Sequence, residues 1–313
     1  LRLRTAASRL VLDATVTRLV QRGRDAPGDP AAFVATADGT EVDRVDLTAT
    51  SLVHEAEDRS LTRGPAAPLR ITLDLGAVPG ERTVEVWLPQ DAGTRLHRIT
   101  GDAPLEAAEP SGAPRWLHHG SSISHGGDAD GPLGPWPRIA AAHLGLDGVN
   151  LGFGGNAMLD PLVARAIAGA EFAVLSLKIG INIVGADAMR RRTLLPALHG
   201  FLDTVRDAHP TTPILLVTAI ACPGVETTPG PIRAGADGRA AGTPREVRTG
   251  DGTLTLEGTR AAVTEVHAAR APDDAALHLL DGTTLLGVHE ADLMPDGLHP
   301  AQPGYDLIAR RFA

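Results

Sequence analysis

Residues 115–123, with the sequence RWLHHGSSI, decide the fold of the later part of the chain. The run 115–119 predicts a short buried strand, and the Gly-Ser-Ser turn after it predicts the start of a helix. A helix N-terminus exposes unpaired backbone N–H groups, which favour a developing negative charge. One serine of the turn can cap this helix, while Ser122 lies at the strand-to-helix turn in a position to react.

Two fragments further along the chain supply candidate donors for an oxyanion. Residues 150–156 (NLGFGGN) have three glycines within four residues, which lets the backbone approach a ligand, and Gly155 is the expected N–H donor. Asn182 follows the apolar run 173–179, at the carboxyl end of a predicted parallel strand, where open α/β sheets place ligands. The glycine pattern lacks the Gly-x-Gly-x-x-Gly spacing of a dinucleotide site.

The fourth fragment, residues 296–299 (DGLH), pairs a carboxylate with an imidazole. The three-residue spacing brings Asp296 and His299 together on one helical or turn face, and such an Asp can fix the imidazole tautomer. Taken alone, each fragment has a simpler interpretation: a helix cap, a glycine-rich connection, a turn asparagine or a surface Asp–His pair. Together and in this order, they supply what acyl transfer through a serine nucleophile requires.

These fragments resemble the sequence blocks of the SGNH hydrolase superfamily, also called GDSL esterases/lipases, across residues 114–313. The resemblance implies a catalytic set and an oxyanion hole: Ser122 as nucleophile, His299 as general base, Asp296 as the acid, and the Ser122 and Gly155 N–H groups with the Asn182 amide as oxyanion donors.

Two positions depart from the family pattern. Ser121 stands where an Asp usually precedes the nucleophile, which removes no member of the triad. Ile183 follows Asn182 where Asp is common, so a support for the orientation of Asn182 is missing.

The first part of the chain has a different pattern. Residues 69–75 and 84–88 alternate apolar and polar side chains, and Asp38-Gly39 is typical of a hairpin turn. Such runs predict an antiparallel β-sandwich over residues 1–112, with residues 105–112 as a linker. A jelly-roll-like domain in this place resembles the arrangement of some carbohydrate esterases.

The remainder, residues 113–313, alternates strands, glycine turns and helices, which predicts a mostly parallel, flavodoxin-like sheet with helices on both faces. The expected helices are 136–144, 159–167, 193–209 and 256–270, and the expected later strands are 173–179, 213–221 and 277–280. Residues 223–251, rich in Gly, Pro and Arg, are long for a structureless loop. They indicate either a mobile segment or a functional excursion near the site.

Composition excludes several classes of protein. A formal charge of −9 argues against a general nucleic-acid binder, and no stretch is long and apolar enough to span a membrane. Cys222 is the single cysteine, so no intramolecular disulfide forms. One lysine among 29 basic residues suggests a GC-rich bacterial genome. We expect a cytoplasmic protein, although a chain that starts without Met is also compatible with a removed leader.

Several aromatic and histidine side chains near the fragments invite a role. His118, His119 and His125 suggest a metal site, but alternation along a strand points the first two to opposite faces, so we expect no metal. His125, Trp136 and Phe153 are candidate substrate-binding residues. An aromatic content of 3% disfavours an extended stacking groove for polysaccharide.

The sequence thus predicts a serine esterase that needs no cofactor and hydrolyses a short-chain acyl ester of a carbohydrate or small metabolite, with acetyl as the expected acyl group. An acyltransferase with the same Ser/His/Asp site is one alternative. A non-catalytic carbohydrate-binding protein is another, and the complete set of Ser122, Asp296 and His299 argues against it.

Overall fold

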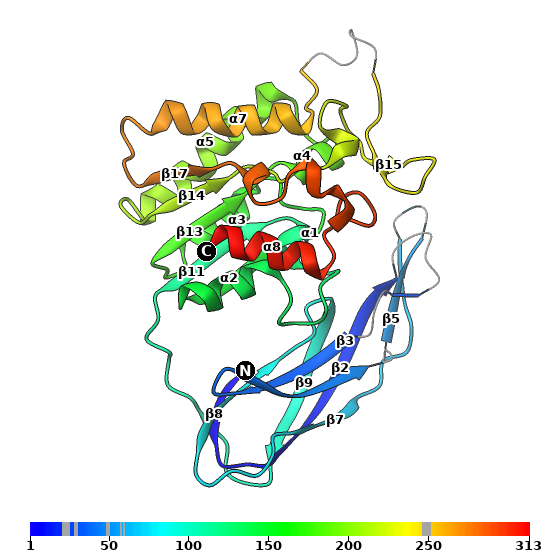
Figure 1. Cartoon of the computed structure of the whole chain (residues 1–313), viewed down its shortest axis with the longest axis vertical. Coiled ribbons are helices and arrows are strands. Elements are labelled where there is room, and N and C mark those ends of the chain that lie inside the picture. The colour runs from blue at the N-terminus through cyan, green and yellow to red at the C-terminus, as the bar shows by residue number, and fades with distance from the viewer. Residues whose placement is uncertain (21–25, 28–30, 48–50, 57, 59, 246–251) are drawn as a thin grey trace. The chain divides into compact units, whose positions relative to one another are not determined.

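The computed structural model describes residues 1–20, 26–27, 31–47, 51–56, 58, 60–245 and 252–313. The chain forms two compact units (Figure 1). The first contains Leu1–Ser111 together with Gly127–Gly134, and the second contains Gly112–Gly126 together with Pro135–Ala313.

Two sheets form the first unit. One has the order β10-β1-β8-β3-β4 and is antiparallel, and the other is built around the long strand β2, which pairs with β5, β7 and β9. The strands of the first sheet are β1 (Arg2–Thr5), β3 (Ala31–Ala37), β4 (Thr40–Leu47), β8 (Arg82–Trp87) and β10 (Glu106–Ala107). Those of the second are β2 (Arg9–Val20), β5 (Ser51–Glu55), β6 (Leu61–Arg63), β7 (Leu69–Asp74) and β9 (Ala92–Gly101).

The inner faces of the two sheets share one apolar core. Leu12 of β2 and Leu73 of β7 pack in the same buried cluster as Phe33 of β3 and Val86 of β8. This confirms the predicted sandwich, although β5 runs parallel to β2 and not antiparallel to it. Burial alternates along β2 and β7, which sends every second side chain outward, whereas β3 is buried along its whole length.

Two predicted connections can be compared with the structure. Asp38 and Gly39 both have positive φ, 47° and 84°, as a two-residue hairpin turn between β3 and β4 requires. The expected linker 105–112 is only partly a linker, because β10 pairs with β1 within it. Local composition predicts a turn-rich stretch but not that its backbone adds a strand to a distant partner.

Gly127–Gly134 belongs by its contacts to the first unit. The Arg44 guanidinium donates to the backbone oxygen of Asp130 at 2.7 Å, and the Gln90 side-chain amide donates to that of Ala129 at 3.2 Å. The sandwich unit therefore takes in a segment from the later part of the sequence.

The second unit is built on a parallel sheet with the order β12-β11-β13-β14-β17. Its strands are β11 (Arg115–Gly120), β12 (Asp147–Gly152), β13 (Val174–Lys178), β14 (Ile214–Val217) and β17 (Leu277–Leu280). Numbered by appearance, this is the 2-1-3-4-5 order of flavodoxin-like sheets, in which ligands bind beyond the carboxyl ends of the strands near the reversal at the first strand.

Helices cover both faces of this sheet. They are α1 (Ser122–His125), α2 (Trp136–Leu144), α3 (Pro161–Ala168), α4 (Ile181–Gly185), α5 (Arg191–Ala208), α7 (Leu256–Arg270) and α8 (Gln302–Phe312). Trp116 of β11 stacks on Phe312 of α8, with ring centroids 5.0 Å apart, whereas His119 of β11 stacks on Phe201 of α5. These odd and even positions of one strand thus mark the two faces, which confirms the predicted α/β class.

Boundaries differ modestly from the prediction. The helix expected at residue 159 begins at Pro161, because Leu159 has a positive φ of 62° and Asp160 is the N-cap. The strand expected over 213–221 ends at Val217. The further connections and short elements are η1 (Pro223–Val225), β15 (Arg233–Ala234), β16 (Ala240–Ala241), η2 (Gly282–Thr284) and η3 (Val288–Leu293). No helix among the described residues has the length and apolar character needed to cross a membrane.

Candidate active site

The two adjacent serines after β11 have different environments. Ser121 is the N-cap of α1, buried, and its hydroxyl accepts a hydrogen bond from the backbone N–H of Ile123 at 3.3 Å. Ser122 is the first residue of the helix, and its Oγ lies 2.9 Å from Nε2 of His299. The cap therefore leaves the Ser122 hydroxyl to the histidine.

Asp296 completes a continuous hydrogen-bonded chain. Its Oδ2 lies 2.7 Å from His299 Nδ1, and its Oδ1 accepts from the backbone N–H groups of Leu298 at 2.8 Å and His299 at 2.7 Å. Partial burial of the carboxyl opposes its ionisation, but the hydrogen bonds from the side chain and backbone of His299, with its nearby charge, prevail and lower the Asp296 pKa to about 2. An ionised Asp296 fixes His299 with Nδ1 protonated, so that Nε2 is free to accept the Ser122 proton.

The expected oxyanion donors lie around the start of α1 and the end of β12. A Cβ placed on Gly154 would lie 3.9 Å from Cβ of Ser122, so this glycine turn approaches the nucleophile closely. Gly155 has a φ of 72°, which favours glycine. Within the described ranges, the backbone N–H groups of Ser122 and Gly155 donate to no protein acceptor, so both remain open to an anion.

Asn182 lies on α4, directly beyond β13. Its Oδ1 accepts a hydrogen bond from the backbone N–H of Ala157 at 3.0 Å. The Nδ2 group of the same amide therefore points away from Ala157 and can donate to another group. Ala157 thus supplies the orientation that an Asp after Asn182 commonly supports, and Ile183 is instead fully buried. Sequence reasoning missed Ala157 because a backbone N–H carries no residue signature.

The predicted substrate-binding residues fall into different places. Phe153 is 40% exposed beside the glycine turn, where a substrate can reach it. His125 ends α1, half-buried, with Nδ1 3.2 Å from the backbone oxygen of Gly152. Trp136 requires a correction: it is fully buried in the α2 core, with its ring centroid 4.7 Å from that of His118. A substrate on the surface cannot contact a side chain in that position.

The two adjacent histidines of β11 diverge, as alternation predicts. His118 bonds the hydroxyls of Ser176 and Ser124, each at 2.7 Å, and burial holds its pKa well below the ordinary value, so it is neutral. His119 bonds the backbone oxygen of Leu151 on the other face. No cluster of three or more metal-ligating side chains occurs within the described part of the chain.

Residues 119–307 match the model of the GDSL-like lipase/acylhydrolase family. A search of curated protein sequences gave no significant match.

Solved structures extend the similarity over almost the whole chain. A salicylyl-acyltransferase, SsfX3, from a tetracycline biosynthetic pathway is 26% identical, with a TM-score of 0.76, covering 99% of this chain and 79% of that one. A GDSL-like lipase structure from Bacteroides ovatus is 18% identical, with a TM-score of 0.70, covering 99% and 81%. A family two carbohydrate esterase from Clostridium thermocellum, solved with cellohexaose, is 15% identical, with a TM-score of 0.63, covering 99% and 89%. The latter two share the fold.

Proposed function

Because the chain belongs to the GDSL-like lipase/acylhydrolase family and is a serine ester hydrolase, we propose that it cleaves a short-chain, acetyl ester of a carbohydrate or small metabolite through an acyl-enzyme on Ser122. The observation that carries this proposal is the hydrogen-bonded chain from Asp296 through His299 to Ser122. The lowered pKa of Asp296 keeps this carboxylate ionised, so that it can hold the Nδ1–H of His299 and leave Nε2 to accept the Ser122 proton.

The proposed reaction has two stages. His299 Nε2 takes the proton of Ser122 as Oγ attacks the ester carbonyl carbon, and the carbonyl oxygen becomes an oxyanion. The Ser122 and Gly155 N–H groups and the Asn182 Nδ2–H group donate to this oxyanion. His299 then protonates the departing alcohol. In the second stage His299 takes a proton from water, which attacks the acyl carbon. His299 then returns this proton to Ser122 Oγ as the bond between Oγ and the acyl carbon breaks, and the acid is released.

The substrate class rests on the organisation of the chain. A sandwich precedes the hydrolase unit, and the carbohydrate esterase with bound cellohexaose has the same fold over 99% of this chain. This supports a carbohydrate or glycosylated alcohol as the leaving group. We further propose that the N-terminal sandwich, residues 1–112, and the hydrolase domain, residues 113–313, are the functional divisions of the chain, with residues 127–134 of the second packing as part of the sandwich unit.

A second function is favoured by one comparison. The salicylyl-acyltransferase covers nearly the whole chain at the highest identity among the structures given above. An acyltransferase would use the same acyl-enzyme and differ in its second stage, in which an alcohol replaces water as the attacking group. The two functions therefore share the residues of the first stage and diverge in the product.

One experiment tests the proposal and separates these outcomes. The protein is incubated with p-nitrophenyl acetate, p-nitrophenyl butyrate and acetylated sugars, and intact mass reports acyl transfer to Ser122. Ser122→Ala must abolish both turnover and the acyl adduct, with Ser121→Ala as the matched control. Adding an acceptor alcohol tests transfer: free acid as the main product supports the hydrolase, and a new ester supports the acyltransferase. Wild-type turnover by Ser122→Ala would overturn both.

A further inference from the structure

The turn that carries Asp296 and His299 has little regular structure of its own. It begins in the last residues of η3 and ends before α8, and we call residues 291–299 the acid–base turn. An irregular backbone must be held by partners outside itself if its side chains are to keep a fixed geometry. Ala301 is one such partner, because its N–H donates to the backbone oxygen of Leu293 at 2.9 Å. Further partners come from residues 222–245, which we call the 222–245 segment and which include most of the Gly/Pro-rich excursion of the sequence.

Arg239 makes two of the contacts. Its Nη2 donates to the backbone oxygen of Ala291 at 3.1 Å and to that of Met294 at 3.0 Å. Among the described residues, Arg239 forms no ion pair with a carboxylate, so its charge is directed at these carbonyls. A charged donor shared by two carbonyls three residues apart fixes the spacing of the turn just before Asp296.

Two further contacts hold the backbone of the catalytic residues. Ala240 N–H donates to the backbone oxygen of Asp296 at 2.7 Å. The thiol of Cys222 donates to the backbone oxygen of Gly297 at 3.2 Å, and burial, with the nearby charge of Glu226, raises the pKa of this thiol to about 12, so it stays a donor. Together with Arg239, these groups bind four carbonyls of the acid–base turn.

Packing between the two segments is close as well. Gly297 has a φ of 78°, and a Cβ placed on it would lie 3.3 Å from the backbone nitrogen of Ala240 and from the Cβ of Arg239. The turn and the 222–245 segment therefore touch along their backbones. Movement of one displaces the other.

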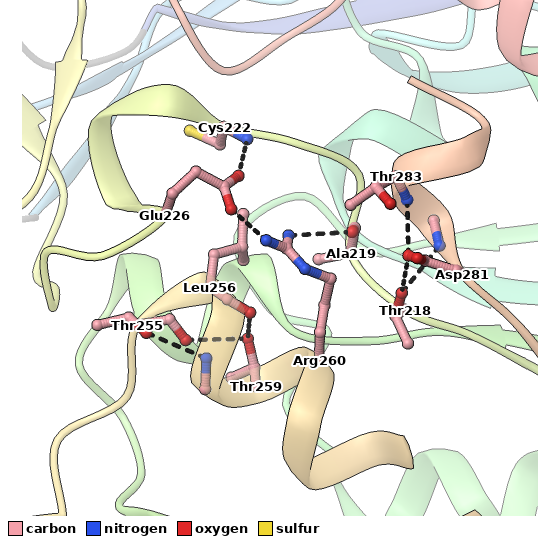
Figure 2. Close-up of polar contacts among 12 residues, drawn as sticks. Thr218, Ala219, Cys222, Glu226, Thr255, Leu256, Thr259, Arg260, Asp281 and Thr283 are labelled. Atoms are coloured by element: carbon pink, nitrogen blue, oxygen red, sulfur yellow. Dashed lines mark hydrogen bonds and ion pairs between the residues drawn. The ribbon is translucent and has the colours of Figure 1, made fainter. Parts of the chain in front are cut away.

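The 222–245 segment is itself anchored at its start. Glu226 accepts a hydrogen bond from the backbone N–H of Cys222 at 2.7 Å and forms an ion pair with Arg260 of α7, and both side chains of this pair are only 14% exposed. Figure 2 shows Arg260 directed at Glu226 and also at the backbone oxygen of Ala219, 3.4 Å away. This half-buried ion pair and the hydrogen bond to Cys222 anchor the start of the segment to α7.

The far part of the segment is attached to the oxyanion side of the site. The Ile232 N–H donates to the backbone oxygen of Gly185, at the end of α4, at 3.0 Å. Arg245 pairs with Asp187, which follows the same helix. Since α4 carries Asn182, the segment links the element that holds the oxyanion amide to the turn that holds Asp296 and His299.

We propose that the 222–245 segment sets the position of the acid–base turn, with Arg239 as its principal positioning residue. The inference rests on the roles proposed above for Asp296 and His299. Without the Arg239 guanidinium the turn loses the donor that spaces two of its carbonyls, and His299 shifts relative to Ser122. Displacements of about 1 Å in reacting geometry can lower a rate by about 100-fold.

The test compares two arginines of the same hairpin in the full-length protein. Arg239→Met keeps the apolar stem and removes the donors. Arg233→Met is the matched control, because Arg233 on β15 is exposed and bonds only the carbonyl of its neighbour Ile232. We expect kcat for p-nitrophenyl acetate to fall at least about tenfold in Arg239→Met with KM unchanged to within about twofold, and neither constant to change in Arg233→Met.

A spectroscopic signal separates positioning from general destabilisation. The proton between His299 Nδ1 and Asp296 Oδ2 should resonate at low field in the proton NMR spectrum, because it lies in a short, charge-assisted hydrogen bond, and His299→Gln assigns it by its loss. In Arg239→Met this signal should broaden through faster exchange with water, and in Arg233→Met it should stay sharp. An unchanged kcat, or a reduced kcat with an unchanged signal, would overturn the proposal.

If Arg239→Met does not fold, Arg239→Lys decides the question. Lysine keeps the charge, but its ammonium lies one bond closer to the backbone than Arg239 Nη2, the nitrogen that donates to both carbonyls. We therefore expect kcat and the signal both to decrease, and wild-type values for both would refute the proposal. The NMR signal does not depend on turnover. A failure of the proposed function, seen as activity in Ser122→Ala, is therefore distinguishable from a failure of this inference.

Discussion

The backbone N–H of Ala157 holds the side-chain oxygen of Asn182 at 3.0 Å and so determines which end of the amide faces outward. The amide is fixed by the loop that follows the glycine turn, not by a neighbour on its own helix. Both proposed oxyanion donors outside α1, Gly155 and Asn182, are thereby connected through one short loop. Movement of this loop changes both donors at once.

Asn182→Ala should lower kcat by about 100- to 1,000-fold with little change in KM, because the Nδ2–H bond strengthens only when the oxyanion forms. Asn182→Asp is the informative companion. It keeps an oxygen for Ala157 but replaces the donor by a negative charge, so its kcat should be no higher than that of the alanine variant. Steady-state kinetics on one activated ester measure both. A raised KM with a normal kcat would show that Asn182 binds the substrate in its ground state and does not stabilise the oxyanion.

Ser121→Ala should retain substantial activity and lose stability. The Ser121 hydroxyl caps α1, and loss of an N-cap costs about 0.5–2 kcal/mol. Ser122→Ala should keep the wild-type unfolding midpoint and lose turnover. Urea unfolding and ester hydrolysis, measured side by side, check the pair. The reverse assignment of the two phenotypes would mean that Ser121 is the nucleophile.

Asp296 should make stability depend on pH in a defined window. Its folded pKa of about 2 lies below the unfolded value of 3.8, so between these values the unfolded chain binds more protons. The carboxylate therefore stabilises the fold above about pH 4, and this contribution disappears as the pH falls through 2. The stability difference between wild type and Asp296→Asn should shrink from pH 5 to pH 2.5 in urea unfolding. A difference that stays constant would contradict the hydrogen-bonded carboxylate.

Chelation should leave ester hydrolysis unchanged. Two of the histidines that suggest a metal site are hydrogen-bonded to protein groups. His118 is bonded to two serine hydroxyls, and His119 is bonded to a backbone oxygen. Dialysis against EDTA, followed by assays with and without added zinc, measures this. Loss of activity that zinc restores would require a metal in the mechanism.

Much of the fold follows from local patterns. Helices 136–144 and 256–270 and strand 277–280 have the bounds that periodicity predicts, because apolar spacing reports directly which face of an element is buried. The different roles of the two serines can also be predicted locally. One serine of a turn that precedes a helix is expected to cap the helix, which leaves the other to react.

Long-range contacts are what the sequence does not reveal. Trp136 lies near the motifs in sequence, yet its burial against His118 is set by the packing of α2 on the sheet. The bond from Arg239 to Ala291 spans 52 positions, and nothing in the composition of either segment indicates it. A Gly/Pro-rich excursion therefore predicts a special role but not which part of the site it supports.

The placement of Gly127–Gly134 in the sandwich unit has a consequence for how such a protein can be rearranged. These residues directly follow α1, the helix that carries Ser122. The backbone oxygens of Asp130 and Ala129 nevertheless accept hydrogen bonds from the side chains of Arg44 and Gln90. Part of the sandwich unit, residues 127–134, is encoded within the sequence of the second unit. A single recombination point in the gene therefore cannot separate the two units. A recombination event that replaced the sandwich would strip both donors from this segment. The two units are therefore expected to be inherited, and to diverge, together.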